Sequence, residues 1–325
     1  MTRIGYFLST EEHAPQDLVR QAQGAEEAGF DALWISDHYH PWLNSQGQAP
    51  FVWSVIGAIG QATALPITTS VTCPTTRIHP AVIAQAVATT ADLARGGFTL
   101  GVGTGEALNE HILGQVWPPA ARRIAMLEEA LEVMRKLWTG ELITHRGEFY
   151  SVDTARLYTL PKESPRVHMS AFGPKATTLA AQAGDGLILA GPSSRTVEMF
   201  RSRGGAEKPI QGGIKVCWGN DEGAARRLAR ERWPTEALVG EALQLLPLPR
   251  HFEQLTEELV TEDMVADVVS CGPDPEVHMA ALEPYFEDGV DEIYISQIGD
   301  DQEGFFEFCT DELLPRIRSR FRPYP

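Results

Sequence analysis

Three things are scarce in this sequence of 325 residues: cysteine, long uncharged apolar runs, and positive charge. The four cysteines include no CxxC pair, which argues against a disulfide framework or a zinc site and favours reduced thiols in a cytoplasmic protein. No stretch approaches the roughly 18 apolar residues of a membrane span. The first residues lack the basic-then-apolar pattern of a signal peptide. We therefore expect neither secretion nor a membrane anchor.

The shortage of cations limits the class of partner. Lys and Arg number 27 against 44 Asp and Glu, which gives a net charge of −17. Such a chain repels phosphate-rich surfaces, so nucleic acid and anionic membranes are poor partners. Hydrophobic residues make up 43% of the chain, an ordinary balance for a globular protein. We expect a small-molecule substrate and assembly as a homodimer.

Strand-like and helix-like segments alternate along nearly the whole chain. Apolar or β-branched runs that predict eight strands lie at 3–9, 32–37, 66–74, 98–105, 166–173, 185–191, 209–219 and 291–299. Helical patterns follow at 15–29, 49–63, 80–94, 120–140, 174–184, 194–203, 221–233 and 302–321. Strands separated by helices form parallel βαβ units, and eight of them predict an α/β protein with a closed (β/α)₈ TIM barrel.

The length fits one such barrel with insertions, since a barrel needs roughly 250 residues. We expect residues 1–325 to form a single domain with two excursions. Residues 141–165 contain no clean helical pattern and predict a hairpin. Residues 233–265 are helical and acidic, and they precede the last strand.

Polar residues cluster directly after the first four predicted strands, where a barrel places its chemistry. Glu11 follows the first strand, and "SDHYHPW" follows the second with Asp37, His38, His40 and Trp42. "TSVTCP" ends the third strand with Ser70, Val71 and Cys73, and "GVGTGEALNE" ends the fourth with Thr104, Gly105, Glu106 and Asn109. The glycine spacing G-x-G-x-G differs from the G-x-G-x-x-G of a dinucleotide fold. We therefore interpret these loops as one site at the barrel mouth.

"SDHYHPW", "TSVTCPTTRIHPAVIAQ" and "GVGTGEALNE" together resemble the luciferase-like hydride-transfer superfamily, and most closely its deazaflavin (coenzyme F420) branch. That branch includes enzymes similar to F420-dependent glucose-6-phosphate dehydrogenase. The resemblance runs in order from residue 4 to about 190 and returns weakly at 270–318. It implies a (β/α)₈ barrel that holds coenzyme F420 with its ring in the mouth.

The resemblance also implies roles for particular residues. His38, paired with Asp37, is expected to move the substrate's hydroxyl proton, Glu106 to exchange a proton with the ring, and Trp42 to wall the site. A non-prolyl cis peptide is expected between Ser70 and Val71, under the ring. "SAFGP" would bind the cofactor phosphate at a helix N-terminus opened by proline. The cofactor-binding residues implied are Asp37, Ser70, Val71, Cys73, Thr104, Gly105, Asn109, Ala171, Phe172, Gly173, Pro174, Ala176 and Thr177.

The sequence departs from the sugar-phosphate enzymes where those enzymes bind the substrate phosphate. Their threonine and lysine after the sixth strand fall on Ala190 and Ser193, and a later arginine falls on Val268. Arg195 lies nearby, and Lys175 is expected at the cofactor phosphate. A substrate dianion would lose charge-assisted contacts worth about 1.5–3 kcal/mol each. We therefore expect a small uncharged alcohol or carbonyl compound in a pocket lined by Glu11, Trp42, Ala190 and Ser193.

Two alternatives remain at this point. A flavin-dependent monooxygenase on the same fold would use a related ring for oxygen chemistry. A metal-dependent hydrolase would use His38 and His40, whose H-x-H spacing suits two zinc ligands on one strand. The latter needs further ligands on later strand ends, and the remaining histidines do not lie there in this assignment. We expect no metal.

Overall fold

A computed structural model describes residues 2–321 and contains a closed barrel of eight parallel strands. Its strands follow the chain around the barrel, and the last pairs with the first, Arg3 lying opposite Glu292. They are β1 (Arg3–Leu8), β2 (Leu33–Ile35), β3 (Ile67–Thr69), β4 (Phe98–Val102), β7 (Arg166–Ser170), β8 (Gly186–Leu189), β9 (Ile210–Cys217) and β11 (Glu292–Gln297). Each lies within one of the eight predicted segments, so the predicted (β/α)₈ fold is confirmed.

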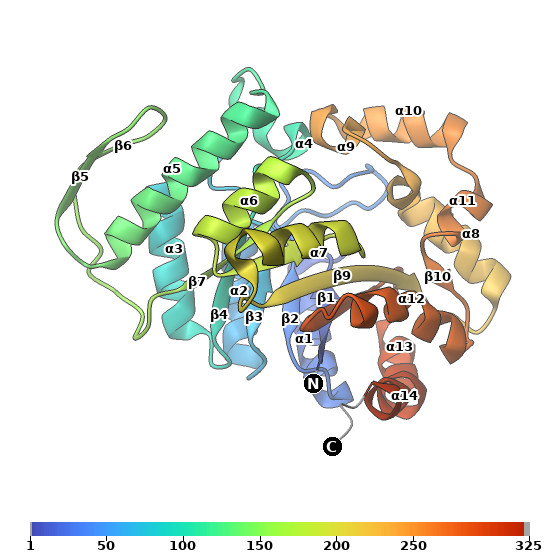
Figure 1. Ribbon diagram of the computed structural model, residues 1–325. Helices are drawn as coiled ribbons and strands as arrows, with labels where there is room; N and C mark the ends of the chain where they lie inside the picture. Colours follow the sequence, from blue (N-terminus) through green and yellow to red (C-terminus); the bar gives the residue numbers. More distant parts are fainter. Residues whose placement is uncertain (1, 322–325) are drawn as a thin grey trace.

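Helices surround these strands (Figure 1). Those at predicted positions are α1 (Pro15–Ala28), α2 (Val52–Ala62), α3 (Pro80–Leu93), α5 (Ala120–Trp138), α6 (Pro174–Ala183), α7 (Ser194–Phe200), α8 (Glu222–Arg232), α13 (Gln302–Phe308) and α14 (Leu314–Arg320). A short α4 (Ala107–Glu110) follows β4. Proline opens α1, α3 and α6, where its missing N–H costs nothing because the first amides of a helix have no partner.

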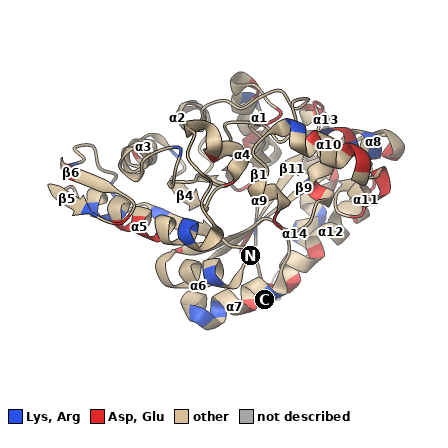
Figure 2. Ribbon diagram, turned by 90° about the horizontal axis from the view of Figure 1, so that it is seen from above, with Lys and Arg blue, Asp and Glu red and all other residues tan. Residues whose placement is uncertain are grey.

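Two excursions leave the regular barrel scheme. The first is an antiparallel hairpin of β5 (Ile143–Arg146) and β6 (Ser151–Ala155) that projects beside α5 (Figure 1). The second contains a 3-10 turn (Pro234–Ala237), α9 (Ala242–Leu245), α10 (Pro249–Leu259) and α11 (Glu262–Ala266). It leads into β10 (Ser270–Cys271), which pairs with β9 outside the closed ring. Seen from above, acidic residues gather on α10 and α11 (Figure 2).

One helix, α12 (Pro275–Glu287), has no counterpart in the sequence analysis. Its signal was present: Asp274 caps the helix by accepting from the Glu276 amide, and Pro275 occupies the first turn. Pro284 lies inside the helix and interrupts the pattern. This helix connects the insertion to β11 and completes the last unit of the barrel.

The strands separate two apolar regions. The larger one lies between the barrel and its helices, with Leu33 and Ile35 of β2 among its buried residues. The smaller one contains Trp34, Ile188 and Tyr294, with Phe7 packed against it. Since successive strand residues face opposite sides, Trp34 and its cluster fill the barrel interior. Within residues 2–321, none of the helices has both the length and the apolar composition to cross a membrane.

Candidate active site

His38 lies between two carboxylates that come from different strands. Its Nε2 is 3.5 Å from Glu11 Oε1 and 3.8 Å from Glu106 Oε2. Glu11 follows β1, His38 follows β2 and Glu106 follows β4, so the barrel topology brings together three residues that are far apart in the chain. The His38 side chain is 11% exposed and that of Glu106 is 32% exposed. The histidine is thus enclosed, and Glu106 faces the opening.

The two carboxylates have pKa values shifted in opposite directions. Burial works to raise the pKa of Glu11, but the neighbouring His38 charge and a hydrogen bond from Ser36 (2.6 Å) outweigh it, so the pKa is lowered. At Glu106, burial dominates and raises the pKa, and His38 offsets only part of the effect. Paired groups with divergent pKa values suit separate roles as acid and base. Glu11 therefore ionises more readily than an ordinary glutamate, and Glu106 ionises less readily.

The predicted pairing of Asp37 with His38 is wrong. Thr72 Oγ1 donates to Asp37 Oδ2 at 2.8 Å, and Arg77 donates to Oδ1 at 2.7 Å. The reason is local: neighbouring residues of an extended segment point to opposite sides. Asp37 therefore faces the loop after β3, and His38 faces the mouth.

Arg77 is a residue that the sequence analysis missed. Besides Asp37, it contacts Glu110: its backbone N–H donates to Glu110 Oε2 at 2.6 Å, and its Nε lies 3.7 Å from Oε1. Burial raises the pKa of Glu110 to about 7, although Arg77 opposes the shift. Arg77 thereby links the loops after β2, β3 and β4 below the site.

Asn109 fixes the loop that carries His38. Its Oδ1 accepts from the backbone amides of Tyr39 (2.9 Å) and His40 (3.2 Å). Its Nδ2 lies 3.2 Å from His38 Nδ1 and 3.1 Å from Glu106 Oε2. Asn109 is buried, and its amide contacts protein atoms on both sides. The structure therefore gives it a positioning role toward the two residues expected to carry the chemistry.

Trp42 forms a wall beside His38. The two ring centroids are 5.3 Å apart, and the Phe252 ring packs edge-on against the Trp42 indole at 5.2 Å. Phe252 belongs to α10, so the insertion reaches over the barrel mouth to support this wall. Figure 1 shows α4, α9 and α10 together at this end of the barrel.

The loops after β3 and β4 pack closely against each other. The peptide bond between Ser70 and Val71 is cis, as the resemblance implied. Gly103 faces Val71, and an added Cβ would approach Val71 Cγ2 to 2.7 Å. Gly105 has φ +87°, which favours glycine, and lies near Cys73. Val71, Cys73, Thr104 and Gly105 are all half-buried, so this surface remains accessible at the mouth.

"SAFGP" forms the loop between β7 and α6. Gly173 precedes the helix, no side chain caps it, and Pro174 opens it. Ala171 and Thr177 are buried, Phe172 is exposed, and the Thr177 hydroxyl donates to the Gly173 carbonyl. The first amides of the helix, including that of Ala176, have no acceptor within the helix. This uncapped helix N-terminus suits an anion.

The residues expected to replace the phosphate-binding side chains differ in their surroundings. Ala190 is exposed after β8. Ser193 caps α7, since its Oγ accepts from the Thr196 amide. Val268, in the turn after α11, is 52% exposed. None of these three side chains can supply a positive charge.

With this geometry in place, comparison with known proteins settles the family. Residues 1–292 match the luciferase-like monooxygenase family. The chain belongs to this family. It is 37% identical to the F420-dependent glucose-6-phosphate dehydrogenase of Kribbella flavida over 97% of this chain and 98% of that one. The enzyme of the same name from Amycolatopsis mediterranei is 34% identical, over 98% and 99% of the two chains.

A solved structure is also similar over nearly its full length. It is an F420-dependent secondary alcohol dehydrogenase in complex with an F420–acetone adduct, 30% identical, with a TM-score of 0.89 over 98% of this chain and 99% of that one. More distant luciferase-like structures, such as a long-chain alkane monooxygenase at 16% identity and TM-score 0.73, share the fold.

His40 points away from His38 in this luciferase-like barrel. His40 Nδ1 lies 2.9 Å from the Leu108 carbonyl oxygen, and His38 Nδ1 lies 3.0 Å from the His40 carbonyl oxygen. The two rings therefore do not converge on a common point. Across residues 2–321, no group of three or more His, Cys, Asp or Glu side chains is arranged to hold a metal ion. The geometry gives the hydrolase alternative no support.

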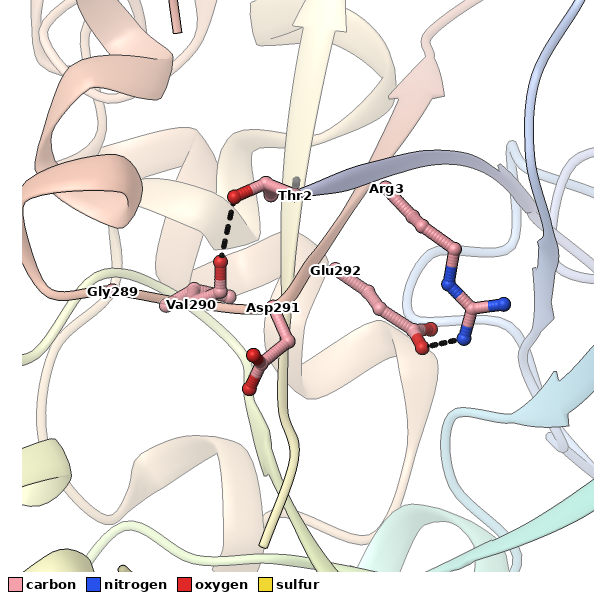
Figure 3. A pocket seen from close by; sticks show the side chains of 6 residues that line it. All are labelled: Thr2, Arg3, Gly289, Val290, Asp291 and Glu292. Atoms are coloured by element: carbon pink, nitrogen blue, oxygen red, sulfur yellow. Dashed lines mark hydrogen bonds and ion pairs between the residues drawn. The ribbon is translucent and has the colours of Figure 1, made fainter. Parts of the chain in front are cut away.

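Two cavities lie at the other end of the barrel. One of about 410 Å³ is lined by residues at the start of β1 and β11, where Arg3 pairs with Glu292 and Thr2 donates to the Val290 carbonyl (Figure 3). Another, of about 170 Å³, includes His168 and Gln211. Active sites of TIM barrels lie at the carboxyl ends of the strands. The convergence of His38, Glu11 and Glu106 therefore marks the site better than cavity volume does.

Proposed function

We propose that this protein transfers a hydride between coenzyme F420 and a small uncharged secondary alcohol or the corresponding ketone. At the level of reaction class it is an F420-dependent oxidoreductase, in agreement with relatives and a structural neighbour that are named as F420-dependent dehydrogenases across nearly the whole chain. The observation that carries the finer assignment is the position of His38 between two carboxylates whose pKa values are shifted in opposite directions. The residues expected to bind a substrate phosphate also carry no positive charge.

The residues present fit the cofactor. A ring could lie on the accessible surface of Val71, Cys73 and Gly105, where the cis peptide and the glycines bring the backbone to the mouth. A phosphate suits the uncapped N-terminus of α6, with Lys175 beside it in the first turn. The other cofactor-binding residues predicted from sequence, apart from Asp37 and Asn109, belong to the loops that form these two places. Those two side chains instead hold the loops in position.

When bound, the cofactor supplies a ring carbon that accepts or returns the hydride. In alcohol oxidation His38 Nε2 takes the hydroxyl proton, and the Glu11 carboxylate stabilises the imidazolium so formed. Glu106, whose pKa is raised by burial, would exchange a proton at the edge of the bound ring. Trp42 closes the side of the pocket and excludes water. In ketone reduction His38 gives the proton back.

The charge of the pocket sets the substrate class. Ala190, Ser193 and Val268 offer no cation, whereas Glu11 and Glu106 bring acidic groups to the mouth. A phosphorylated sugar would lack two or three charge-assisted contacts of about 1.5–3 kcal/mol each, which corresponds to a loss of several orders of magnitude in affinity. The name of the structural neighbour, a secondary alcohol dehydrogenase, supports the uncharged alternative.

The test has two parts. The protein is titrated with F420, with flavin mononucleotide and with nicotinamide cofactors while its tryptophan fluorescence is followed. We expect F420 to quench the fluorescence of Trp42 at a lower concentration than the other cofactors. Loss of the visible absorbance of oxidised F420 is then followed with neutral secondary alcohols and with glucose 6-phosphate. Efficient, saturable oxidation of glucose 6-phosphate would contradict the substrate class. Tighter binding of flavin mononucleotide, or product formation that requires oxygen, would favour the monooxygenase alternative.

A further inference from the structure

A lysine lies inside the barrel just below the site. In β9 the residues Gln211, Gly213 and Lys215 share one face, because side chains alternate along a strand. Gln211 accepts a hydrogen bond from Trp34, and Gly213 lies against the Trp34 ring, so this face points into the barrel. Lys215 is the member of the row nearest the carboxyl end of β9. It therefore points into the upper part of the barrel interior.

The surroundings of Lys215 confirm this position. Its Nζ lies 4.1 Å from the ring centre of Trp233 and 5.7 Å from that of Phe7. Its charge also helps to lower the pKa of Glu11. Burial, which raises this pKa, and His38 and Ser36, which lower it, have larger effects. Lys215 is 16% exposed. A cation thus lies in the upper part of the barrel interior, where its charge acts on Glu11, a feature that the sequence analysis did not identify.

This cation already has a partner. Glu236 Oε1 lies 2.9 Å from Lys215 Nζ, and the Glu236 side chain is 30% exposed. Glu236 belongs to the 3-10 turn that starts the insertion, directly after Trp233. The Trp233 indole N–H donates to Glu12, which fixes this wall to the loop after β1. The insertion therefore carries a carboxylate to a place where a substrate anion would otherwise meet Lys215.

We propose that Glu236 selects substrates by their charge. By neutralising Lys215, it makes the barrel mouth accept uncharged alcohols and reject anionic ones. This inference rests on the proposed function and adds to it a residue that selects for charge. An incoming carboxylate or phosphate must displace Glu236 from Lys215 or remain beside it, and both are unfavourable because like charges repel at short range in a partly buried site. With Glu236 neutral, Lys215 becomes a partner for an anionic secondary alcohol.

The experiment uses the F420-loaded enzyme and the substitution Glu236→Gln, which keeps the size of the side chain and removes its charge. Butan-2-ol and 3-hydroxybutyrate form a matched pair of neutral and anionic secondary alcohols. We expect kcat/KM for 3-hydroxybutyrate relative to butan-2-ol to rise about tenfold or more, the effect of one charge-assisted contact. The change should appear in KM, with kcat for butan-2-ol little altered.

Two further variants make the result specific. Glu258→Gln removes the same charge from an exposed residue of α10 and should leave the ratio unchanged. Adding Lys215→Gln to Glu236→Gln should abolish the gain. An unchanged ratio in Glu236→Gln, an equal gain in Glu258→Gln, or a gain that persists without Lys215 would overturn the proposal.

A second readout does not depend on turnover. Inorganic sulfate is titrated into the same loaded variants, and the rise in melting temperature reports its binding. Glu236→Gln should bind sulfate about tenfold more tightly than the native protein, an advantage that is lost on adding Lys215→Gln. If the native enzyme oxidises no neutral alcohol, the proposed function fails, while the sulfate titration still decides whether Glu236 masks Lys215.

Discussion

The two ends of the barrel interior contain similar residues in different arrangements. At the upper end, Glu11 and Glu106 flank His38 at 3.5 and 3.8 Å. At the lower end, Glu292 is buried and accepts from Arg3, Gln211 and Tyr294. A carboxylate that accepts from three donors is fixed in position and contributes to stability, whereas two carboxylates beside one histidine are placed to exchange protons with it. The same residue types thus serve chemistry or stability according to how completely their partners satisfy them.

An aromatic layer separates the two ends. Trp34 stacks on Tyr294 with ring centroids 4.4 Å apart, and Phe7 packs edge-on against Trp34 at 5.6 Å. These rings fill the barrel between the polar groups and leave the upper site closed from below. Changes at one end should therefore leave the other end largely unaffected, since well-separated sites contribute almost additively.

The largest expected effect is on stability, at the lower end. Glu292→Leu removes the common acceptor of Arg3, Gln211 and Tyr294, and leaving the buried Gln211 and Tyr294 donors without it should cost about 3–5 kcal/mol of unfolding free energy in total, at about 1–3 kcal/mol for each group with the lost Arg3 contact added. Urea denaturation measures this loss, and Glu292→Gln, which keeps an acceptor oxygen, should lose less. A fall in kcat of about 100-fold in folded Glu292→Leu protein would contradict the separation of a stabilising lower end from a catalytic upper end.

The next effect is on activity, at the upper end. His38→Ala and Glu106→Gln should each lower kcat by roughly 10²-fold or more, because each removes a proton-transfer group. F420 binding, followed by tryptophan fluorescence, should largely survive. His168→Gln at the lower end is the matched control and should leave kcat nearly unchanged. Full turnover by His38→Ala would mean that the base is another residue.

A pH-dependent effect is expected at Glu12, next to the upper end. Burial raises its pKa to about 7, and the hydrogen bond from Trp233 only partly opposes this. Because the pKa of Glu12 is higher in the folded protein than in the unfolded chain, its protonated carboxyl contributes to stability. That contribution is fully present below the unfolded-state pKa of about 4.5 and is lost as the pH rises through 7. The Gln side chain is neutral at every pH. The unfolding free energy of Glu12→Gln should therefore be about 2–3 kcal/mol higher than that of the native protein near pH 8.5 and equal to it near pH 4.5. Urea denaturation at both pH values gives the comparison, and an equal difference at both would refute it.

The smallest expected effect sharpens the role of the aromatic layer. Tyr294→Phe keeps the stack on Trp34 and removes the hydroxyl that contacts Glu292 and Gln211. The unfolding free energy should fall by about 1 kcal/mol, the usual net value of one hydrogen bond. Initial rates should not change. A clear fall in kcat would show that the lower end influences the site through this layer.

The barrel and much of the site could be predicted because topology does the assembling. Strands alternate with helices along the chain, and the residues that follow each strand lie at the same rim of the barrel, so the positions of His38, Glu106 and Trp42 near one another follow from the sequence. The hairpin near 141–165 followed from the absence of a helical pattern there.

The errors concern side-chain direction. Asp37 adjoins His38 in sequence, but its partner Arg77 is 40 residues away, and no local pattern marks that arginine as a link. The sequence did contain a signal for Lys215, because a charged residue is unusual in a barrel strand, which faces the interior on one side and the surrounding helices on the other. Its partner Glu236 belongs to the insertion, whose path across the mouth depends on packing that the sequence pattern does not specify.

The contact between Trp42 and Phe252 has a consequence for how such enzymes diversify. The proton-transfer groups belong to loops directly after barrel strands, whereas α10 supports the pocket wall from a segment that the barrel itself does not require. Exchanging residues 233–265 between relatives would therefore reshape the cavity offered to substrates while leaving the reaction chemistry in place.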